Sequence, residues 1–272
     1  MSDFPALETT NGYYCNQDQN IIGVNEAHTK GDWTKIRNAR TTGDQSVLLL
    51  VPRFAGDTLH RHLYDVGIGA SGSIVTLLPN CLHETETTGN RQLIAYTYVP
   101  FQLPNSVEIW GRTQGHTAGS GTVALITGFA QSGFRFAPSL SRAVSFGTNT
   151  TDTTGTVIDP GASANVKGAW TQIESATAMA SRWLILWLTN NFNGVDVNQN
   201  VRLDIGIGPA GSEVPVVSDF LFNHAAVNDG VYPQVVSFPC TIPSSVRLAV
   251  RAQSTNNDAT DRLFMIAITG LE

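Results

Sequence analysis

Apolar and polar residues alternate over short stretches of this chain, which is the pattern of strands that bury one face. The stretch Val-Glu-Ile-Trp-Gly-Arg at residues 107–112 alternates in this way, and so does Val-Arg-Leu-Ala-Val-Arg at residues 246–251. No stretch of a dozen residues keeps the apolar spacing of an amphipathic helix. The pattern therefore predicts an all-β protein built from short strands.

The same phrases occur twice, in the same order and at nearly constant spacing. Lys-Gly-Asp-Trp-Thr-Lys-Ile at residues 30–36 returns as Lys-Gly-Ala-Trp-Thr-Gln-Ile at residues 167–173. Asp-Val-Gly-Ile-Gly-Ala-Ser-Gly-Ser at residues 65–73 returns as Asp-Ile-Gly-Ile-Gly-Pro-Ala-Gly-Ser at residues 204–212. Chance would scatter such matches, so the sequence predicts two units related by internal duplication.

Several short strands separated by turn residues fall within each unit, which is typical of a β-sandwich. We therefore expect two tandem β-sandwich units of the jelly-roll-like kind. The expected organisation is an N-terminal arm at residues 1–30, a first sandwich at residues 31–132, a linker with a possible strand at residues 133–166, and a second sandwich at residues 167–272.

Two runs, at residues 47–51 and 183–188, are apolar at every position rather than at every second one. A strand of this kind must be covered on both of its faces. We expect both runs to be central strands that are buried within their own sandwich or packed against the other unit.

Charged residues make up 14% of the chain, and its net charge is -6. Nucleic-acid binding needs a basic face, so nucleic acid is not expected as a partner. The apolar runs are too short to span a membrane, and no signal-peptide pattern opens the chain. The cysteines show no Cys-x-x-Cys spacing. We expect no membrane association and no cofactor.

The repeated glycines formally match a dinucleotide-binding fingerprint, with Gly67, Gly69 and Gly72 in the first copy. That fingerprint works only where the glycines end a strand and open a helix. Here β-branched residues and prolines follow in both copies, so no helix is expected. We interpret the motif as a strand that ends in a glycine turn, capped by Asp65 or Asp204 through backbone N–H groups.

A pair of histidines, His60 and His62, lies near Asp65 and raises the question of a metal site. Alternate residues of a strand share a face, so both imidazoles could reach one ion. The second copy has Gln199 and Val201 at these positions, however, and no further ligand falls at a recognisable spacing. We expect a surface or turn pair and no metal.

Two arginines, Arg112 and Arg251, recur at matched positions that the alternation turns outward. We expect them to brace a nearby loop carboxylate. Trp110 falls on the same outward face, while Ala249 replaces it in the second copy, so Trp110 is expected to be an interface or glycan contact. The positions expected to carry the shared structural role are Trp33, Trp170, Asp65, Asp204, Gly67, Gly69, Gly206, Gly208, Arg112 and Arg251.

The repeated phrase runs Trp-Thr-x-Ile, then Asp-x-Gly-Ile-Gly-x-x-Gly-Ser, then a proline-flanked strand and Arg-x-Gln. It resembles virion surface proteins of tailed bacteriophages, which include head decoration or cement proteins and β-sandwich modules of tails and fibres. The resemblance covers about residues 30–129 and 167–271. It implies β-sandwiches on the outside of a particle and brings no catalytic residues.

We therefore expect a non-enzymatic structural protein that decorates or cements the exterior of a phage capsid. Its partners would be the major capsid protein or other virion proteins, and it would form a homo-oligomer, with a trimer as the expected form. Its location would be the virion, after assembly in the host cytoplasm. Segments 1–30 and 130–168 would lie across neighbouring subunits. The alternatives are a tail or fibre adhesin that binds host surface glycans and a cupin-like metal-dependent enzyme that uses His60 and His62.

Overall fold

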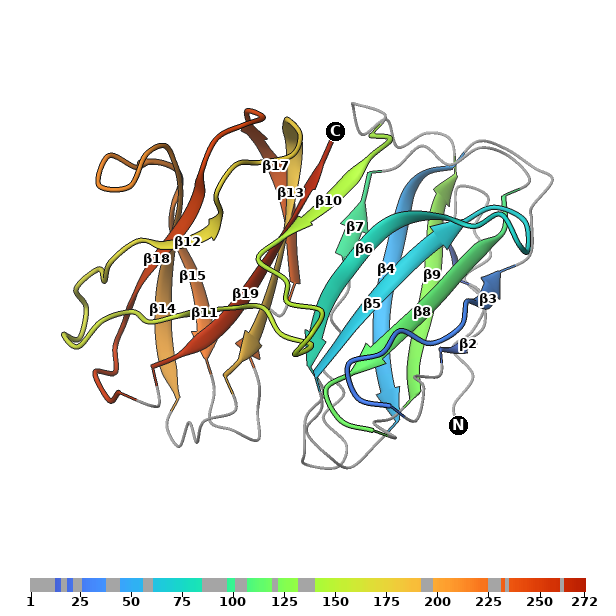
Figure 1. Ribbon diagram of the computed structural model, residues 1–272, viewed down its shortest axis with the longest axis horizontal. Helices are drawn as coiled ribbons and strands as arrows, with labels where there is room; N and C mark the ends of the chain where they lie inside the picture. The colour runs from blue at the N-terminus through green and yellow to red at the C-terminus, as the bar shows by residue number, and fades with distance from the viewer. Residues whose placement is uncertain are drawn as a thin grey trace.

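The computed structural model describes residues 13–15, 19–21, 26–37, 45–55, 61–84, 97–100, 107–118, 122–131, 140–191, 198–224, 231–232, 235–259 and 262–272. These residues form strands and turns, and none of them is helical. The strands build two β-sandwiches that lie side by side (Figure 1). The prediction of an all-β fold with two tandem, jelly-roll-like sandwiches is therefore confirmed. The described residues hold no long apolar helix that could cross a membrane.

The first sandwich consists of two antiparallel sheets. In one sheet the strands are β1 (Tyr13–Cys15) and β2 (Gln19–Ile21), which both pair with β9 (Thr122–Gln131), followed by β4 (Gln45–Ala55) and β7 (Thr97–Val99). In the other sheet the order is β3 (Thr34–Arg37), β8 (Ile109–Gly115), β5 (Arg61–Ile68) and β6 (Val75–Glu84).

The second sandwich is built in the same way. In its first sheet the strands are β10 (Ala143–Phe146) and β11 (Thr156–Ile158), which both pair with β19 (Phe264–Leu271), followed by β13 (Ser181–Asn190) and β17 (Val235–Ile242). In its second sheet the order is β12 (Thr171–Glu174), β18 (Leu248–Ser254), β14 (Gln199–Ile207), β15 (Val214–His224) and β16 (Val231–Tyr232).

The two sandwiches therefore share one strand order, because β9-β4-β7 matches β19-β13-β17 and β3-β8-β5-β6 matches β12-β18-β14-β15. An origin by duplication and the domain boundaries given above stay predictions. The arm and the linker also correspond. Strands β1 and β2 pair one after the other with the same edge of β9, and β10 and β11 pair in this way with β19. These strands extend sheets of their own chain, contrary to the expectation that both segments lie across neighbouring subunits.

Strand β13 is buried on both faces, as its unbroken apolar run predicts. Leu184, Leu186 and Leu188 belong to the core of the second sandwich, whereas Ile185 and Trp187 belong to a core that continues into the first sandwich. The other apolar run, residues 47–51, lies within β4, which is a central strand of its sheet. The side chains of that run lie outside the described residues.

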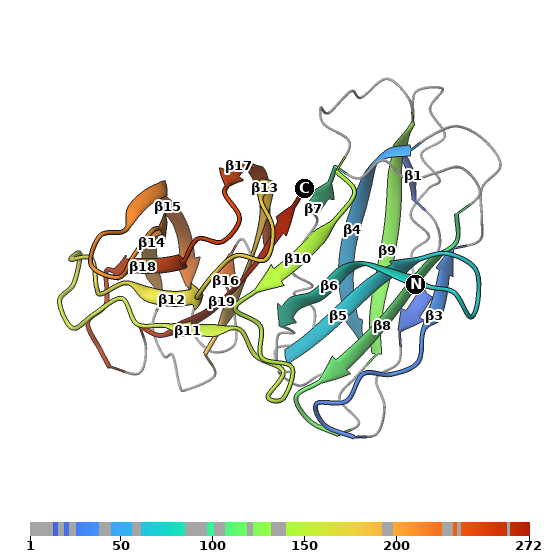
Figure 2. The ribbon, with the colours of Figure 1, turned by 45° about the horizontal axis from the view of Figure 1, so that its top comes forward.

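The sandwiches meet where β6, an edge strand of the first, lies against β10, β13 and β19 of the second (Figures 1 and 2). The contact is mainly apolar, and two hydrogen bonds cross it. Ser145 donates a hydrogen bond to the Pro79 carbonyl, and the Glu84 carboxylate accepts one from the Asn190 backbone N–H. Because the apolar core runs through this contact, the two sandwiches behave as one packed body.

Candidate functional site

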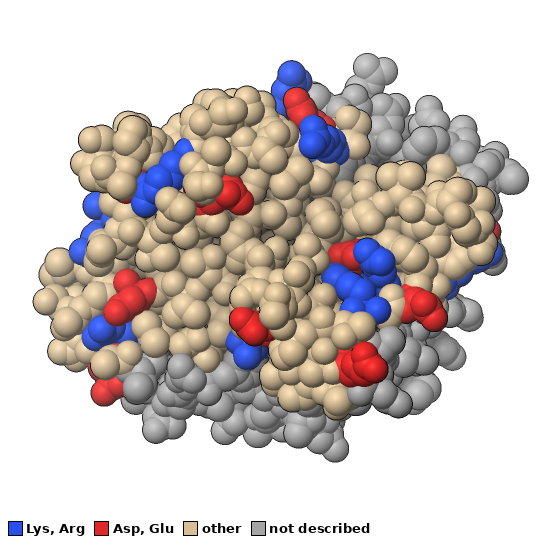
Figure 3. Space-filling model, viewed as in Figure 1, with Lys and Arg blue, Asp and Glu red and all other residues tan. Residues whose placement is uncertain are grey.

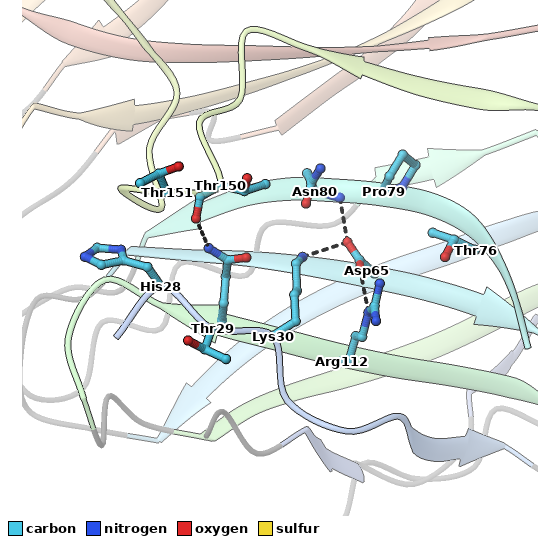
Figure 4. Close-up of a pocket in the computed structure, with 11 residues that line it drawn as sticks. His28, Thr29, Lys30, Asp65, Thr76, Pro79, Asn80, Arg112, Thr150 and Thr151 are labelled. Atoms are coloured by element: carbon cyan, nitrogen blue, oxygen red, sulfur yellow. Dashed lines mark hydrogen bonds and ion pairs between the residues drawn. The ribbon is translucent and has the colours of Figure 1, made fainter. Parts of the chain in front are cut away.

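The carboxylate of Asp65 is the centre of a buried cluster on the outer face of the first sandwich. The register of β5 against β6 shifts beside it, and Asn80, at this bulge, has a φ of 50°. The Asn80 N–H lies 2.7 Å from Asp65 Oδ1, Lys30 Nζ lies 2.7 Å from the same oxygen, and Arg112 Nε lies 2.7 Å from Oδ2 (Figure 4). Three donors thus hold a carboxylate whose side chain is only 3% exposed.

Arg112 is held in place by Trp33 as well as by Asp65. Its guanidinium lies 4.5 Å from the centre of the Trp33 ring, which is the geometry of a cation–π contact. The indole also lies against Gly67, where an added Cβ would come within 2.6 Å of Ile74 Cγ2 and 2.9 Å of Trp33 Cη2. A glycine is therefore needed at this position because the isoleucine side chain and the indole together occupy the space of a side chain.

The second sandwich repeats the cluster around Asp204. This carboxylate accepts hydrogen bonds from Lys167 at 2.7 Å, from Arg251 at 2.9 Å and from the Asp219 N–H at 2.9 Å. Arg251 lies 4.6 Å from the ring centre of Trp170. Burial acts to raise the pKa of Asp204, but these hydrogen bonds together hold it below its ordinary value. Each arginine thus braces a nearby carboxylate, as the sequence suggests. The carboxylate lies on a strand, however, and not on a loop.

The glycine motifs form turns between strands. Gly69, with a φ of 126°, and Gly208, with a φ of 116°, follow β5 and β14 and lead into β6 and β15. The Gly69 N–H donates to the Glu108 carbonyl at 3.1 Å, and Gly208 does the same to Arg247. A strand follows each glycine cluster in place of the helix that dinucleotide binding requires.

Trp110 is buried, contrary to the expectation of an exposed contact residue. Its side chain is 7% exposed, and its Nε1–H donates to the Gly69 carbonyl at 2.7 Å. The Lys35 ammonium lies 5.3 Å from the ring centre and covers one face. The alternation correctly put Trp110 outside the sandwich core, but local packing against the glycine turn removes it from solvent.

His62 is also buried, whereas a surface or turn position was expected. It lies on the inward face of β5 with Tyr64 and Val66, opposite His83 of β6. Burial and the neighbouring His62 lower the pKa of His83 well below its ordinary value. His60 lies outside the described residues, and the described part of the chain holds no group of three residues that could ligate a metal.

An open groove runs over the Asp65 cluster, with a volume of about 740 Å³. Figure 4 shows the loop between β10 and β11 above the strands, with the carbonyl of Thr150 turned toward Gln114. Gln114 fixes this loop, because its Nε2 donates to the Thr150 carbonyl at 2.7 Å and to Thr153 Oγ1 at 2.8 Å. The residues that line the groove are His28, Thr29, Lys30, Asp65, Thr76, Pro79, Asn80, Arg112, Gln114, Thr150 and Thr151.

Hydroxyls, amides and cations are prominent in the lining. On the rest of this face, charged side chains gather in small clusters of both signs (Figure 3). Among the described residues that line the groove, Asp65 is the one carboxylate, and three donors already engage its oxygens. Because both of its oxygens already accept hydrogen bonds, this carboxylate has little capacity left to contact a ligand. The arrangement is suited to hydrogen bonding with a polar ligand. Reasoning from the sequence missed the groove, since its outer wall comes from the segment expected to be a linker.

Comparison of the sequence with family models and with curated proteins finds no match. The fold is similar to solved tandem β-sandwiches. PNGF-II matches with 7% identity and a TM-score of 0.43 over 95% of this chain, which spans 64% of PNGF-II. PNGase F, a glycosylasparaginase from Flavobacterium meningosepticum, matches with 9% identity and a TM-score of 0.45 over 96% of each chain. A tandem CBM22 domain of Paenibacillus barcinonensis matches with 9% identity, a TM-score of 0.26, and coverage of 97% of this chain and 95% of the other. Similarities at this level concern the fold alone.

The expected role in a phage virion is wrong, both on the capsid and in a tail or fibre. The cupin-like enzyme stays a prediction. The similar solved structures include a glycosylasparaginase and a CBM22 tandem domain. The motif that gave the resemblance also has an explanation within the chain, because Trp33, Asp65, Gly67 and Arg112 contact one another. The motif thus has a structural role within the fold and does not by itself indicate a particle surface.

Proposed function

We propose that the groove of the first sandwich binds a saccharide and that the chain is a carbohydrate-binding protein without a catalytic site. A sugar ring presents several hydroxyls that both donate and accept hydrogen bonds, and it needs partners fixed in direction. Lys30 and Arg112 supply such groups from positions that their contacts with Asp65 hold in place. Hydroxyls of Thr29, Thr76 and Thr151 line the same space.

The observation that carries the proposal is the fixed position of Arg112. Its Nε is used by Asp65 and its plane rests on Trp33, while 31% of the side chain stays exposed at the groove. Because the guanidinium has five N–H groups, the terminal nitrogens can meet a ligand while Nε stays bound. Little side-chain entropy is lost on binding when the donor is held in this way.

The test is a titration of the isotope-labelled protein with a panel of neutral and acidic oligosaccharides. Binding is measured by the changes in backbone NMR chemical shifts. We expect at least one member to bind with a Kd of about 1 mM or tighter, which corresponds to about -4 kcal/mol. The shifted residues should cluster around Lys30, Thr76 and Arg112. A panel that moves none of these signals at saturating concentration contradicts the proposal.

The chain supplies a matched control for the variant Arg112→Ala. Arg251→Ala removes the same contacts with an aspartate and a tryptophan, but in the second sandwich. Both variants should lose similar stability, whereas only Arg112→Ala should weaken saccharide binding, by about tenfold to a hundredfold. An equal loss of binding in both variants would mean that the effect comes from folding and not from the groove.

A further inference from the structure

The two aspartate clusters differ at one residue that decides their charge. Asp219 in the second sandwich lies at the bulge position that Asn80 occupies in the first, and the φ angles, 54° and 50°, are nearly the same. Asp219 Oδ1 lies 3.1 Å from Lys167 Nζ, so that lysine contacts two carboxylates. At the corresponding place the first sandwich has an uncharged amide.

The hydrogen-bonded cluster of the second sandwich therefore has two cations and two carboxylates, whereas that of the first has two cations and one carboxylate. Exposure does not separate the clusters, since Lys30 and Lys167 are 18% and 19% exposed, and Arg112 and Arg251 are 31% and 32% exposed. Burial lowers the pKa of the Lys30 ammonium, and nearby Arg112 adds to this, although Asp65 opposes it. Because Lys30 and Arg112 share one carboxylate, Asp65, the positive charge of this cluster is compensated only in part.

A loop beside the cluster also favours a bound ligand in the first sandwich. Thr150 and Thr151 come from the loop between β10 and β11, which Gln114 and His28 tie to β8 and to the segment before β3. Partial enclosure lowers the local dielectric constant and strengthens the interaction of Lys30 and Arg112 with an anion.

We propose that the groove selects saccharides that bear a carboxylate, which Arg112 and Lys30 bind, and that Asn80 permits this selectivity by leaving the charge of Lys30 available. This inference rests on the proposed saccharide-binding function. Arg112 presents a planar fork of N–H groups that matches a carboxylate, and an aspartate at position 80 would repel the ligand and engage Lys30.

The test uses a matched pair of probes, oligogalacturonate and its fully methyl-esterified form, which differ in charge and share the sugar chain. Binding to the full chain is measured by isothermal titration at low salt and at high salt. The variants are Asn80→Asp, which copies the second sandwich, and Asp219→Asn, which makes the reverse change away from the groove. Because aspartate occurs at this bulge with the same φ in the second sandwich, Asn80→Asp should fold.

We expect the acid to bind about tenfold or more tightly than the ester, with an affinity that falls as salt rises. Asn80→Asp should remove most of that preference, while Asp219→Asn, which lies away from the groove, should alter neither the preference nor the binding of the ester. Equal binding of acid and ester, or a preference that survives Asn80→Asp, overturns this inference and leaves the proposed function standing. No binding of either probe, together with no hit from the neutral panel, overturns both. Binding of acetate alone at the same affinity would also overturn it, since the sugar would then contribute nothing.

Discussion

The ring of Tyr64 stands edge-on against the indole of Trp187 across the contact between the two sandwiches. Their centroids are 5.9 Å apart and the planes meet at 87°. Both side chains are almost fully buried, and the Trp187 Nε1–H donates to Thr269 Oγ1 at 2.9 Å. Edge-to-face packing and a satisfied N–H make this pair a central part of the shared core.

We expect Trp187→Ala to lower the free energy of unfolding by about 3–5 kcal/mol, the usual cost of deleting a buried tryptophan. Because the core is continuous, unfolding in urea should remain a single transition in both proteins. Fluorescence and circular dichroism should report the same midpoint. Val166→Ala, at a side chain that is 56% exposed, is the control and should change stability little. Two separate transitions in the unsubstituted protein would show that the sandwiches fold independently.

The contact between each motif glycine and its tryptophan gives a second prediction. Gly67→Ala would put a Cβ 2.9 Å from Trp33 Cη2, and Gly206→Ala would put one 2.7 Å from Trp170 Cη2. Each should destabilise the protein by about 1–3 kcal/mol, since the ring must move off the backbone and release the arginine stacked on it. Thermal unfolding measures this, with exposed Ser73→Ala as the control. If both alanine variants kept the original midpoint, the close approach of ring and backbone would be refuted.

His224 makes the stability dependent on pH. Its side chain is fully buried with Nδ1 at 2.7 Å from Gln199 Nε2, and burial lowers its pKa to about 4. The unfolded chain binds a proton at the ordinary pKa of about 6.5, whereas the folded chain does not until about pH 4. The contribution of this neutral imidazole to the free energy of unfolding is therefore complete above pH 6.5. It is lost as the pH falls from there to about 4, by up to about 1.4 kcal/mol per pH unit.

Urea unfolding at steps between pH 7 and pH 4.5 measures that loss. His83, whose pKa burial also lowers, adds to the slope in the same direction. His224→Gln should reduce the slope of the free energy of unfolding against pH by the contribution of about one bound proton. The contribution of His83 should remain. Val166→Ala removes no titrating group and should keep the full slope. An unchanged slope in His224→Gln would mean that this imidazole does not stay neutral in the folded state.

Several features could be predicted from the pattern of residue types because they depend on neighbours close in sequence. Period-2 alternation gave an all-β fold, and the unbroken apolar run at residues 183–188 gave a strand covered on both faces, as β13 is. The β-branched residues after Gly69 and the proline after Gly208 excluded a helix, and turns lead into β6 and β15. Short-range propensity is sufficient for such features.

The candidate site could not be predicted in this way, because its parts meet only through long-range contacts. Thr150 lies over the first sandwich through its bond to Gln114, and the buried state of Trp110 depends on Gly69 and Lys35. Aligning the two copies of the repeat puts Asn80 opposite Asp219. The effect of this difference on charge depends on the lysine that lies near each residue.

By itself the sequence determined the strand-rich fold, its two similar units and the glycine turns, since these follow from side-chain periodicity and backbone preference. Only the tertiary structure decided which outward residues are buried and where the linker lies. It also decided that in one aspartate cluster, which lies beneath a groove, two cations share a single carboxylate. Burial and charge compensation depend on distances between residues far apart in the chain, and those distances are set when the sheets pack together.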